Sequence, residues 1–431
     1  MASSVHVNQA VLITPSEPTP NQILQLSALD SQLFVRFTFE YLLVYKPRRG
    51  IDRDVITGNV KSALGRTLVP YYPLAGRVRP RPDGKGLEVV CRAQGALFID
   101  AVSSFTVSEF DGAPRRRAHW RRLLSLHMED VLKGGPPLVI QLTWLLDGGA
   151  ALAVGFNHCL CDGVGSGQFL NSFAELALGL TELKPRPTWS RHLLDPVLPL
   201  RLSRDDSVSL PVFGAVPDVC GFNARFLGER LMPTSIVFDK NRLNELKKST
   251  KSSSRHTSFE VVSAHVWRSW ARALNLAPNQ IVKLVFSVNI RQRVRPSLPS
   301  GYYGNAFVLG CAEACVGDLA GKGVGDAAEL VARAKERVGG EHVREVVESV
   351  SWRNRASVDQ VGVLIMTQWS RLGLESVDFG MGNPVQVGPV CCDKYCIVLP
   401  VCGVPDALKV NLAVPLTSLH QYLYFLTNIH V

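Results

Sequence analysis

Apolar positions along this 431-residue chain recur with two different spacings, which is typical of a protein that mixes strands and helices. Alternation with a period of two predicts strands at "QAVLITP", "LEVVCRA" and "LFIDAV". Apolar residues three and four positions apart predict a helix over residues 52–69 and another over "GSGQFLNSFAELALG". Strands and helices therefore alternate from the N-terminus to about residue 180.

The second part of the chain shows the same mixture. Strands are predicted within "ARFLGERLMPTSIVFD" and "VGVLIMTQW", and in the cysteine-bearing segment near the C-terminus. A helix over 257–274 can be capped by Thr257 or Ser258, and a helix over 325–340 by Asp326. The pattern as a whole predicts the α/β class.

A proline-rich stretch without periodicity separates the two parts, at residues 182–220. Prolines at irregular spacing interrupt both helices and central strands, so we expect a linker there. The predicted organisation is an N-terminal lobe of residues 1–181, this linker, and a C-terminal lobe of residues 221–431.

The stretch "NHCLCDG" places candidate chemistry between a strand and a helix. The apolar run "ALAVGFNH" predicts a buried strand that ends at His158, so His158 and Asp162 fall in the turn before the next helix. Glycines at 163, 165 and 167 allow close backbone approach there. Imidazole can accept a proton at neutral pH and return it, so His158 is a candidate general base. From spacing alone, Asp162 either orients that ring or pairs with an arginine, and His158 itself has a purely structural alternative.

Metal binding is a poor interpretation of the same stretch. Adjacent residues of an extended segment point to opposite faces, so His158, Cys159 and Cys161 do not converge easily on one ion. The four cysteines near the C-terminus lack a paired C-x-x-C spacing and are interpreted as small buried residues; they are Cys391, Cys392, Cys396 and Cys402. We expect free thiols and no metal.

Composition and charge narrow the choice of partner. The chain is 46% hydrophobic with a formal net charge of +10, which suits an anionic partner without identifying it. A basic cluster at 113–123 has helical spacing and no nucleic-acid-binding motif beside it, so no nucleic acid is expected. No signal peptide and no run of about 20 apolar residues is present, so we expect a cytoplasmic protein without a membrane span.

Several short motifs occur in an order that resembles the plant BAHD acyltransferases. "HCLCDG" resembles their HxxxDG motif, and "VDFGMGNP" at 377–384 resembles their DFGWG motif. Between and around them lie "LSALD", "YYPLAGR", "RPTWSR", "SFEVVSAHVWR", "LPSGYYGN" and "TQWSRL", so the resemblance covers nearly the whole chain.

The resemblance implies two chloramphenicol-acetyltransferase-like lobes with mixed sheets and a tunnel between them. An acyl-coenzyme A co-substrate would enter from one mouth and an alcohol or amine acceptor from the other, with no permanently bound cofactor. His158 would remove the hydroxyl proton, so that the oxygen attacks the thioester without a covalent acyl-enzyme. Asp162 would support the turn through Arg291, and the Trp369 indole would stabilise the oxyanion. We also expect a monomer.

The second motif is interpreted as architectural. Asp378 would brace its turn, and Gly380 and Gly382 would shape the coenzyme side, which we expect near Ser258 and Met381. Met381 replaces the usual tryptophan.

Asn289 stands where an acidic residue often precedes the arginine pair. These two departures keep a second function open: a catalytically silent relative that assists very-long-chain fatty acid or wax elongation.

Subfamily resemblance indicates a substrate class. "HCLCDGVGSGQFLNSFAE" is similar to members that move hydroxycinnamoyl groups onto long-chain alcohols or ω-hydroxy fatty acids in cutin, suberin and wax chemistry. Residues after "LSALD", including Phe34, Arg36 and Thr38, are candidates for the tunnel wall, with plain packing as the alternative. Hydroxycinnamoyl transfer to an alcohol is therefore the predicted reaction.

Overall fold

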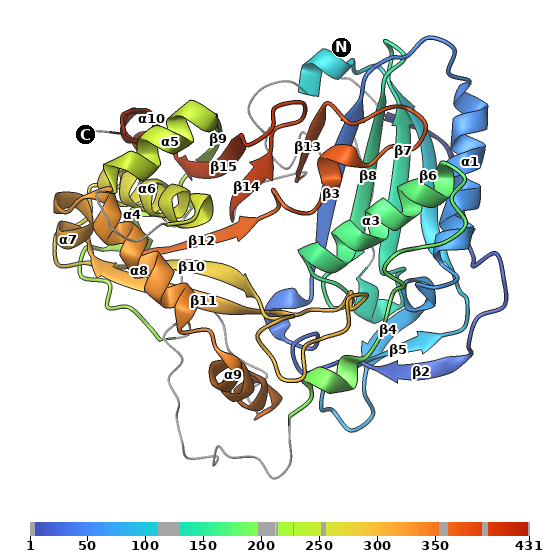
Figure 1. Cartoon of the computed structure of the whole chain (residues 1–431), viewed down its shortest axis with the longest axis horizontal. Helices are drawn as coiled ribbons and strands as arrows, with labels where there is room; N and C mark the ends of the chain where they lie inside the picture. Colours follow the sequence, from blue (N-terminus) through green and yellow to red (C-terminus); the bar gives the residue numbers. More distant parts are fainter. Residues whose placement is uncertain are drawn as a thin grey trace.

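The computed structural model describes residues 5–110, 130–196, 212, 214–226, 228–250, 256–352, 361–389 and 395–429. The basic cluster at 113–123, residues 197–211 of the predicted linker, and Cys391 with Cys392 lie outside these ranges. Figure 1 shows two lobes side by side, each built on one large sheet with helices packed against it. The mixed α/β architecture predicted from the sequence is confirmed.

The first lobe contains a six-stranded sheet in the order β1-β6-β7-β8-β3-β13. The bounds of these strands are β1 Val5–Ile13, β6 Ala96–Ser103, β7 Leu138–Trp144, β8 Ala150–Asn157, β3 Thr38–Tyr45 and β13 Gln386–Pro389. A three-stranded sheet lies at one end of the lobe, in the order β2 (Gln22–Gln25), β5 (Leu87–Cys91) and β4 (Arg77–Pro80). Every residue of β7 and β8 is buried, so the two strands form the centre of the lobe.

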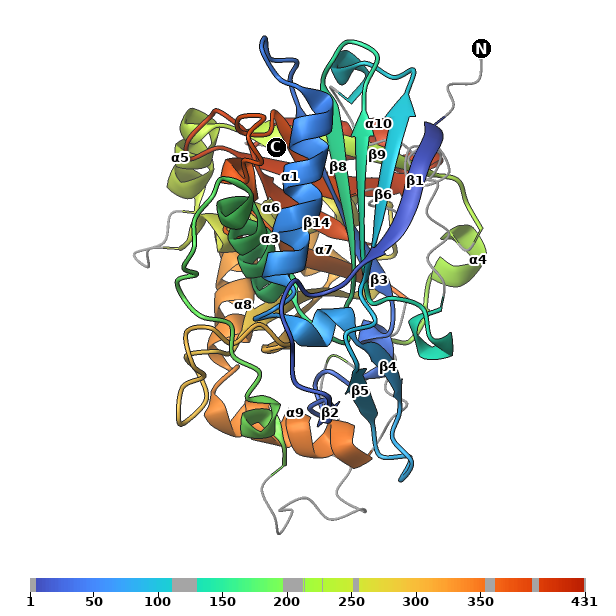
Figure 2. The ribbon, with the colours of Figure 1, turned by 90° about the vertical axis from the view of Figure 1, so that its right-hand side faces the viewer.

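Two helices cover one face of this sheet, α1 (Arg53–Thr67) and α3 (Gly163–Ala177). They lie next to each other, as both ribbon views show (Figure 2). The buried side of α3 contributes Phe169, Leu170 and Phe173 to the core of the lobe. Because α3 packs directly on β8, its N-terminus is held close to the end of that strand.

The second lobe contains another six-stranded sheet, in the order β11-β10-β12-β14-β15-β9. Its strands are β11 Phe307–Cys315, β10 Ile281–Asn289, β12 Val363–Gln368, β14 Cys396–Pro400, β15 Leu408–Pro415 and β9 Leu231–Phe238. Its helices are α4 Phe222–Phe226, α5 Lys240–Ser249, α6 Ser258–Ala273, α7 Val316–Gly321, α8 Val324–Glu336, α9 Gly340–Trp352 and α10 Leu419–Thr427. The described residues also contain short 3-10 helices: η1 Leu33–Val35, η2 Tyr72–Ala75, η3 Val107–Phe110, η4 Val131–Lys133, η5 Arg191–Leu194, η7 Leu374–Ser376 and η8 Leu416–Ser418.

The helix ends follow the predicted signals in one case and differ in another. Thr257 caps α6, and the Glu260 carboxylate accepts the Thr257 backbone N–H at 2.7 Å, which completes a capping box. The prediction that Asp326 is the N-cap of α8 is wrong, because Gly323 holds that place. Asp326 lies three residues further and accepts the Gly323 backbone N–H at 3.1 Å. A carboxylate at the N-cap or three residues later can accept a free N–H at the start of a helix. The sequence therefore does not distinguish these two positions.

One strand from the C-terminal part of the chain belongs to the first sheet. β13 pairs antiparallel with β3, with Val387 opposite Leu43. The preceding segment is anchored as well, since the Tyr45 hydroxyl donates to the Val377 carbonyl at 2.9 Å. The division of the chain at residue 220 stays a prediction, and this pairing shows that the segment carrying the DFGMG motif packs on the first lobe.

No helix in the described ranges is both long enough and apolar enough to cross a membrane.

Candidate active site

The candidate base lies in a five-residue connection between β8 and α3. β8 ends at Asn157, and the carboxylate of Asp162 accepts the Gly165 backbone N–H at 2.9 Å as the N-cap of α3. The expectation that Gly163, Gly165 and Gly167 lie in the turn is corrected, since the helix already begins at Gly163. A Cβ at Gly165 would overlap the Tyr303 carbonyl oxygen, so this position admits only glycine.

Asp162 is the centre of a buried hydrogen-bond network that joins the two lobes. Its two carboxylate oxygens accept from Arg291 Nη1 at 2.9 Å and Nη2 at 2.8 Å, a bidentate pair. The Ala306 backbone N–H donates to the same carboxylate at 3.0 Å. Burial alone would raise the pKa of Asp162, but Arg291 and these N–H groups hold the pKa below its ordinary value. Asp162 therefore stays ionised at neutral pH, and both of its carboxylate oxygens are occupied by these hydrogen bonds.

Arg291 is itself held from several sides. It donates from Nε to the Tyr302 carbonyl at 3.2 Å and from Nη2 to the Gly304 carbonyl at 2.9 Å. The Asn289 side-chain oxygen accepts the Arg291 backbone N–H at 3.0 Å. Asn289, a departure from the family pattern, thus supports Arg291, since the same oxygen also lies 3.4 Å from Arg291 Nη1.

A second buried network supports the other end of the same turn, and the sequence assigned no role to its members. Asn305 Nδ2 donates to the His158 carbonyl at 2.6 Å and to Asp30 Oδ1 at 2.8 Å. Asp30 is fully buried and also accepts from the Ser27 hydroxyl at 2.7 Å. The signal was present in the quoted motifs "LSALD" and "GYYGN", but only the structure shows that they meet beneath His158.

The positive charge that balances Asp30 comes from Arg191. Its Nε lies 3.1 Å from Asp30 Oδ2, and its Nη2 donates to the Leu160 carbonyl at 2.6 Å. The guanidinium is 2% exposed and lies over the Trp189 ring at 4.2 Å from the centroid. Arg191 and Arg291 therefore both bind the connection between β8 and α3. Arg191 holds the Leu160 carbonyl, and Arg291 holds the Asp162 carboxylate.

The His158 ring lies among aromatic side chains. Its centroid is 4.9 Å from that of Phe39, 5.3 Å from Phe37 and 5.6 Å from Phe307. Phe37 and Phe39 come from the start of β3, and Phe307 from the start of β11, so both lobes contribute to this cage. An apolar cage favours uncharged ligand groups beside the imidazole.

Burial lowers the pKa of His158 below its ordinary value, and the nearby Asp162 and Asn305 oppose that effect. The imidazole is therefore neutral at pH 7 and can accept a proton. Nδ1 is buried and makes no hydrogen bond of regular geometry, while the ring interacts with the carbonyl of His158 itself.

Trp369 lies one aromatic ring away from this imidazole. Phe39 separates the two, with its centroid 6.5 Å from that of Trp369, and Tyr41 packs on the indole at 4.7 Å. Trp369 is 9% exposed, and its N–H makes no hydrogen bond to any residue that the structure describes, yet it is not among the fully buried polar atoms. This donor is therefore open to a ligand.

The neighbouring thiols are poor nucleophiles. Burial raises the pKa of Cys159 to about 12 and raises the pKa of Cys161 well above its ordinary value. The Cys159 thiol donates to the Val35 carbonyl at 3.6 Å. Both side chains thus stay protonated at neutral pH, and within the ranges that the structure describes no three His, Cys, Asp or Glu side chains gather as a metal site.

The DFGMG segment lies far from His158 along β3. Its Asp378 carboxylate accepts the Gly380 and Gly382 backbone N–H groups at 2.7 and 2.8 Å. Both glycines have φ near +90°, a conformation that favours glycine. The segment is anchored at Tyr45, six residues along β3 from Phe39, which corresponds to about 20 Å at roughly 3.3 Å per residue. The segment is thus held at the far end of β3 from Phe39, whose ring contacts His158.

Two residues were expected near the coenzyme. Met381 is 4% exposed and packs in the core of the first lobe, so its side chain offers little surface to a ligand. Ser258 lies in the first turn of α6 in the second lobe and is partly exposed. Of the two, Ser258 is the better placed to meet a bound molecule.

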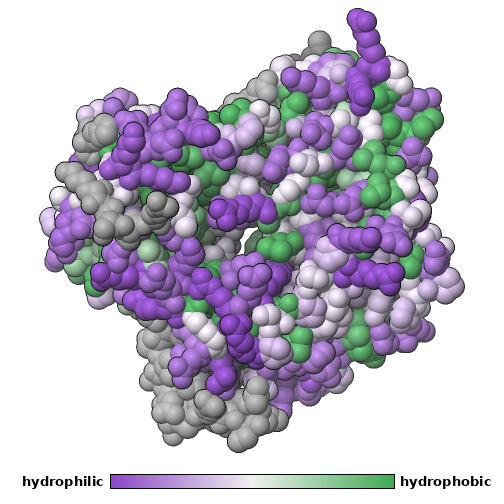
Figure 3. Space-filling view, viewed as in Figure 1, coloured by the Kyte–Doolittle hydropathy of each residue, from purple (hydrophilic) through white to green (hydrophobic). Residues whose placement is uncertain are grey.

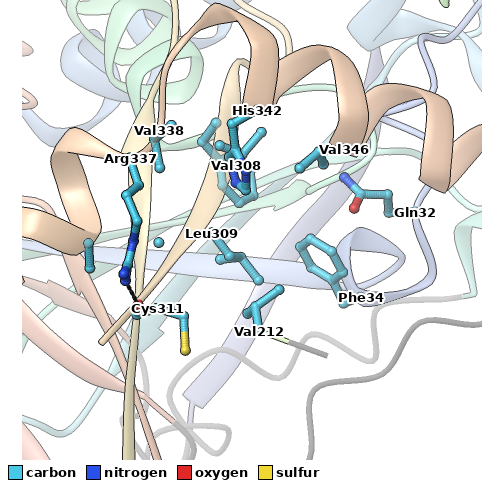
Figure 4. A pocket seen from close by; sticks show the side chains of 13 residues that line it. Gln32, Phe34, Val212, Val308, Leu309, Cys311, Arg337, Val338, His342 and Val346 are labelled. Carbon is cyan, nitrogen blue, oxygen red and sulfur yellow. Dashed lines mark hydrogen bonds between the residues drawn. The ribbon is translucent and has the colours of Figure 1, made fainter. Parts of the chain in front are cut away.

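The surface is hollowed where the two lobes meet, near the centre of the face in Figure 3. A separate view shows a pocket between η1, β11, α8 and α9 (Figure 4). Phe34 and Phe307 line this pocket, and Phe307 also contacts the His158 ring. The pocket and the aromatic cage around His158 thus share the Phe307 side chain.

Comparison with protein families finds one model over almost the entire chain. The model described as "Transferase family" matches residues 3–421. The chain is 32% identical to a taxadien-5-alpha-ol O-acetyltransferase from Taxus chinensis, over 97% of this chain and 95% of that protein. It is 30% identical to an omega-hydroxypalmitate O-feruloyl transferase from Arabidopsis thaliana, over 97% of this chain and 92% of that protein.

Solved structures show the same fold. The crystal structure of vinorine synthase superposes with a TM-score of 0.74 at 22% identity, over 97% of this chain and 96% of that one. The crystal structure of F. sporotrichioides TRI101 complexed with coenzyme A and T-2 gives a TM-score of 0.74 at 16% identity, over 93% and 97% of the two chains. At these identities the likeness concerns the two-lobed fold alone, and it confirms the predicted arrangement.

Proposed function

Since this chain belongs to the BAHD acyltransferases, the "Transferase family" of the comparison above, we propose that it transfers an acyl group from coenzyme A to an alcohol with His158 as the general base. The observation that carries this proposal is the neutral, partly exposed imidazole of His158, fixed by two buried networks and facing an aromatic cage. Such a base needs no further activation to accept a hydroxyl proton.

The proposed reaction has two proton transfers and no covalent enzyme intermediate. A proton kept on Nδ1, against the carbonyl of His158, leaves Nε2 with a free lone pair. Nε2 takes the hydroxyl proton as the acceptor oxygen bonds to the thioester carbonyl carbon. The resulting oxyanion accepts a hydrogen bond, for which the free Trp369 N–H is the candidate donor. The C–S bond then breaks, and the coenzyme A thiolate takes the proton back from the imidazolium.

The residues that support this base have structural roles in the proposal. Asp162 is held as a carboxylate by Arg291, so it stabilises the start of α3 instead of exchanging protons. Cys159 and Cys161 remain thiols at neutral pH, so an acyl-cysteine is not expected. Coenzyme A acts as a co-substrate in this scheme, with Ser258 as a candidate contact.

An aromatic acyl group fits the surroundings of the base. Three phenylalanine rings surround His158, and flat conjugated acyl groups gain from offset and edge contacts with such rings. The relatives are named for acetyl, benzoyl and feruloyl transfer, so family membership does not choose among donors. We propose a hydroxycinnamoyl donor such as feruloyl-coenzyme A.

The test is turnover of purified protein with feruloyl-, caffeoyl-, coumaroyl-, benzoyl- and acetyl-coenzyme A against long-chain and aromatic alcohols. Thiol release and product mass are expected only when donor and acceptor are both present. His158→Ala should lower turnover by about 100-fold or more, as expected for loss of a general base. His192→Ala changes an exposed histidine and should leave turnover unchanged.

Wild-type turnover in His158→Ala would refute the assignment of the base. Mass addition to the protein with donor alone would instead indicate an acyl-enzyme. The alternative function, a catalytically silent partner in fatty acid elongation, predicts no turnover across the whole panel.

A further inference from the structure

The indole that the proposed reaction uses comes from the lobe opposite to the base. Trp369 directly follows β12 of the second lobe, and its backbone N–H donates to the Val398 carbonyl of β14 at 2.7 Å. Its side chain, however, lies in the core of the first lobe. The chain then continues to η7, which packs on α3 (Figure 1). Contacts between the two lobes therefore set the position of Trp369 relative to His158.

Tyr41 makes one of these contacts with both ends of its side chain. It lies on β3, is fully buried, and packs on the indole of Trp369 with the ring centroids 4.7 Å apart. Its hydroxyl oxygen lies 2.8 Å from Ser166 Oγ. The Ser166 hydroxyl donates its proton to the Asp162 carbonyl at 2.9 Å, so the Tyr41 hydroxyl is the donor to Ser166.

These contacts form a continuous line from the indole to the turn that carries the base. Ser166 lies in the first turn of α3, Asp162 caps that helix, and His158 lies four residues before Asp162. A tyrosine ring is rigid and has only two rotatable bonds. A shift of the indole relative to α3 must therefore displace the buried Tyr41 ring or break its hydrogen bond to Ser166.

A second contact holds the segment after Trp369 against the same helix. Asn171 Nδ2 donates to the Leu372 carbonyl at 3.2 Å and to the Gly167 carbonyl of its own helix at 2.8 Å. A Cβ at Gly167 would lie 2.9 Å from the Leu372 carbonyl oxygen, so glycine allows this close approach. One helix, α3, thus carries the turn of the base at its N-terminus and the Trp369 segment along its side.

We propose that Tyr41 is the positioning residue of the Trp369 indole, and that its hydrogen bond to Ser166 keeps the indole N–H at a fixed distance from His158. The proposal rests on the proposed acyl transfer, in which this N–H meets the oxyanion. Burial raises the pKa of Tyr41 well above its ordinary value, so its hydroxyl stays protonated and takes no part in proton transfer. A displacement of about 1 Å at a reacting group can cost about 100-fold in rate.

The first experiment removes only the hydroxyl group, in Tyr41→Phe. We expect kcat to fall about tenfold and both KM values to stay within about twofold, because the affected interaction forms only in the transition state. Tyr71→Phe is the matched control. Tyr71 is also fully buried, its hydroxyl lies 3.4 Å from Ser172 on the same helix, and its ring packs on Tyr303. This control should keep kcat within about twofold.

A double-mutant cycle tests whether Tyr41 acts through the indole. Trp369→Phe should lower kcat by about 100-fold or more, as loss of an oxyanion donor does. Adding Tyr41→Phe to it should change kcat by less than about twofold, since the group that Tyr41 positions is gone. Ser166→Ala removes the acceptor of the same hydrogen bond and should reproduce the tenfold loss, including where Tyr41→Phe does not fold.

Three kinetic outcomes would overturn the proposal. They are a further tenfold loss in the double variant, an equal loss in Tyr71→Phe, and a raised KM with unchanged kcat in Tyr41→Phe. The first would show that Tyr41 acts independently of the indole. The second would show that any buried hydroxyl beside α3 matters equally, and the third would place Tyr41 in substrate binding.

A second measurement needs no turnover. The chain contains seven tryptophans, so labelling with 5-fluorotryptophan gives seven fluorine NMR signals, and Trp369→Phe identifies the one from Trp369. Tyr41→Phe should shift or broaden this signal, and Tyr71→Phe should leave it in place. A signal that does not respond to Tyr41→Phe would refute the positioning role. If no donor and acceptor pair turns over but the signal responds to Tyr41→Phe alone, the acyl-transfer function fails and the positioning of the indole stands.

Discussion

Replacing Asp162 by asparagine tests how far the active-site turn depends on one buried ion pair. The carboxylate is 4% exposed and accepts two N–H groups of Arg291, while the Arg291 side chain is only 13% exposed. Asparagine keeps the size but removes the charge, and it turns an NH₂ group toward donors. Breaking one partner of a buried pair costs about 3–5 kcal/mol, because the other charge stays buried.

That loss should be visible in thermal unfolding. At about 2–4 °C per kcal/mol for a domain of 150–250 residues, we expect Asp162→Asn to lower Tm by roughly 6–20 °C, measured by circular dichroism at pH 7. Asp239→Asn is the matched control, because exposed Asp239 caps α5 through the Arg242 backbone N–H and asparagine caps equally well. A Tm within about 2 °C of the unchanged protein would refute the assigned role of the pair.

The same variant gives a pH test. The pKa of Asp162 is lowered in the folded protein, so its stabilisation is present above the ordinary carboxyl pKa of about 3.9 and is lost as the pH falls through the lower folded value. The difference in Tm between the two proteins should therefore be full at neutral pH and shrink in strong acid. A difference that is constant down to unfolding in acid would contradict the charge-based explanation.

The remaining predictions concern the base and its supports. Because the pKa of His158 is lowered, kcat/KM should hold as the pH falls to about 6.5 and decline only below it, and a midpoint above that value would contradict the assignment. Asn305→Ala removes the donor shared by Asp30 and the His158 carbonyl, so kcat should fall about tenfold. The midpoint of the pH profile should also move further toward acid, whereas a purely structural role of Asn305 would leave that midpoint in place. Gly165→Ala places a Cβ on the Tyr303 carbonyl and should lower Tm by several degrees, as overpacking does, and an unchanged Tm would show that the lobes separate easily here.

The sequence predicted the parts of this site that depend on local pattern. A buried strand followed by a helix places His158 in the connection between them, because hydrophobic periodicity defines both elements. The pairing of Asp162 with Arg291 came from the family resemblance, and the structure brings the two side chains together. Spacing alone left the role of Asp162 open, since a carboxylate four residues after a histidine fits several functions.

The sequence did not predict contacts that depend on long-range packing. Asp30, Arg191 and Asn305 are separated along the chain by more than a hundred residues, and nothing local indicates that they share one buried network. α3 begins at Gly163, two residues before the predicted start at Gly165, because Asp162 caps the helix and glycine by itself does not indicate a helix.

The pairing of β13 with β3 has a consequence for biosynthesis. β3 ends at residue 45 and β13 begins at residue 386, so ribosomes add some hundreds of residues between the two strands. At roughly 5–20 residues per second, the nascent first sheet waits on the order of tens of seconds with the backbone of β3 unpaired along that edge. Unpaired edges recruit strands from other chains. The interval before β13 emerges is thus the time when the growing chain most needs a chaperone, and a truncated product that ends before residue 386 would keep this exposed edge permanently.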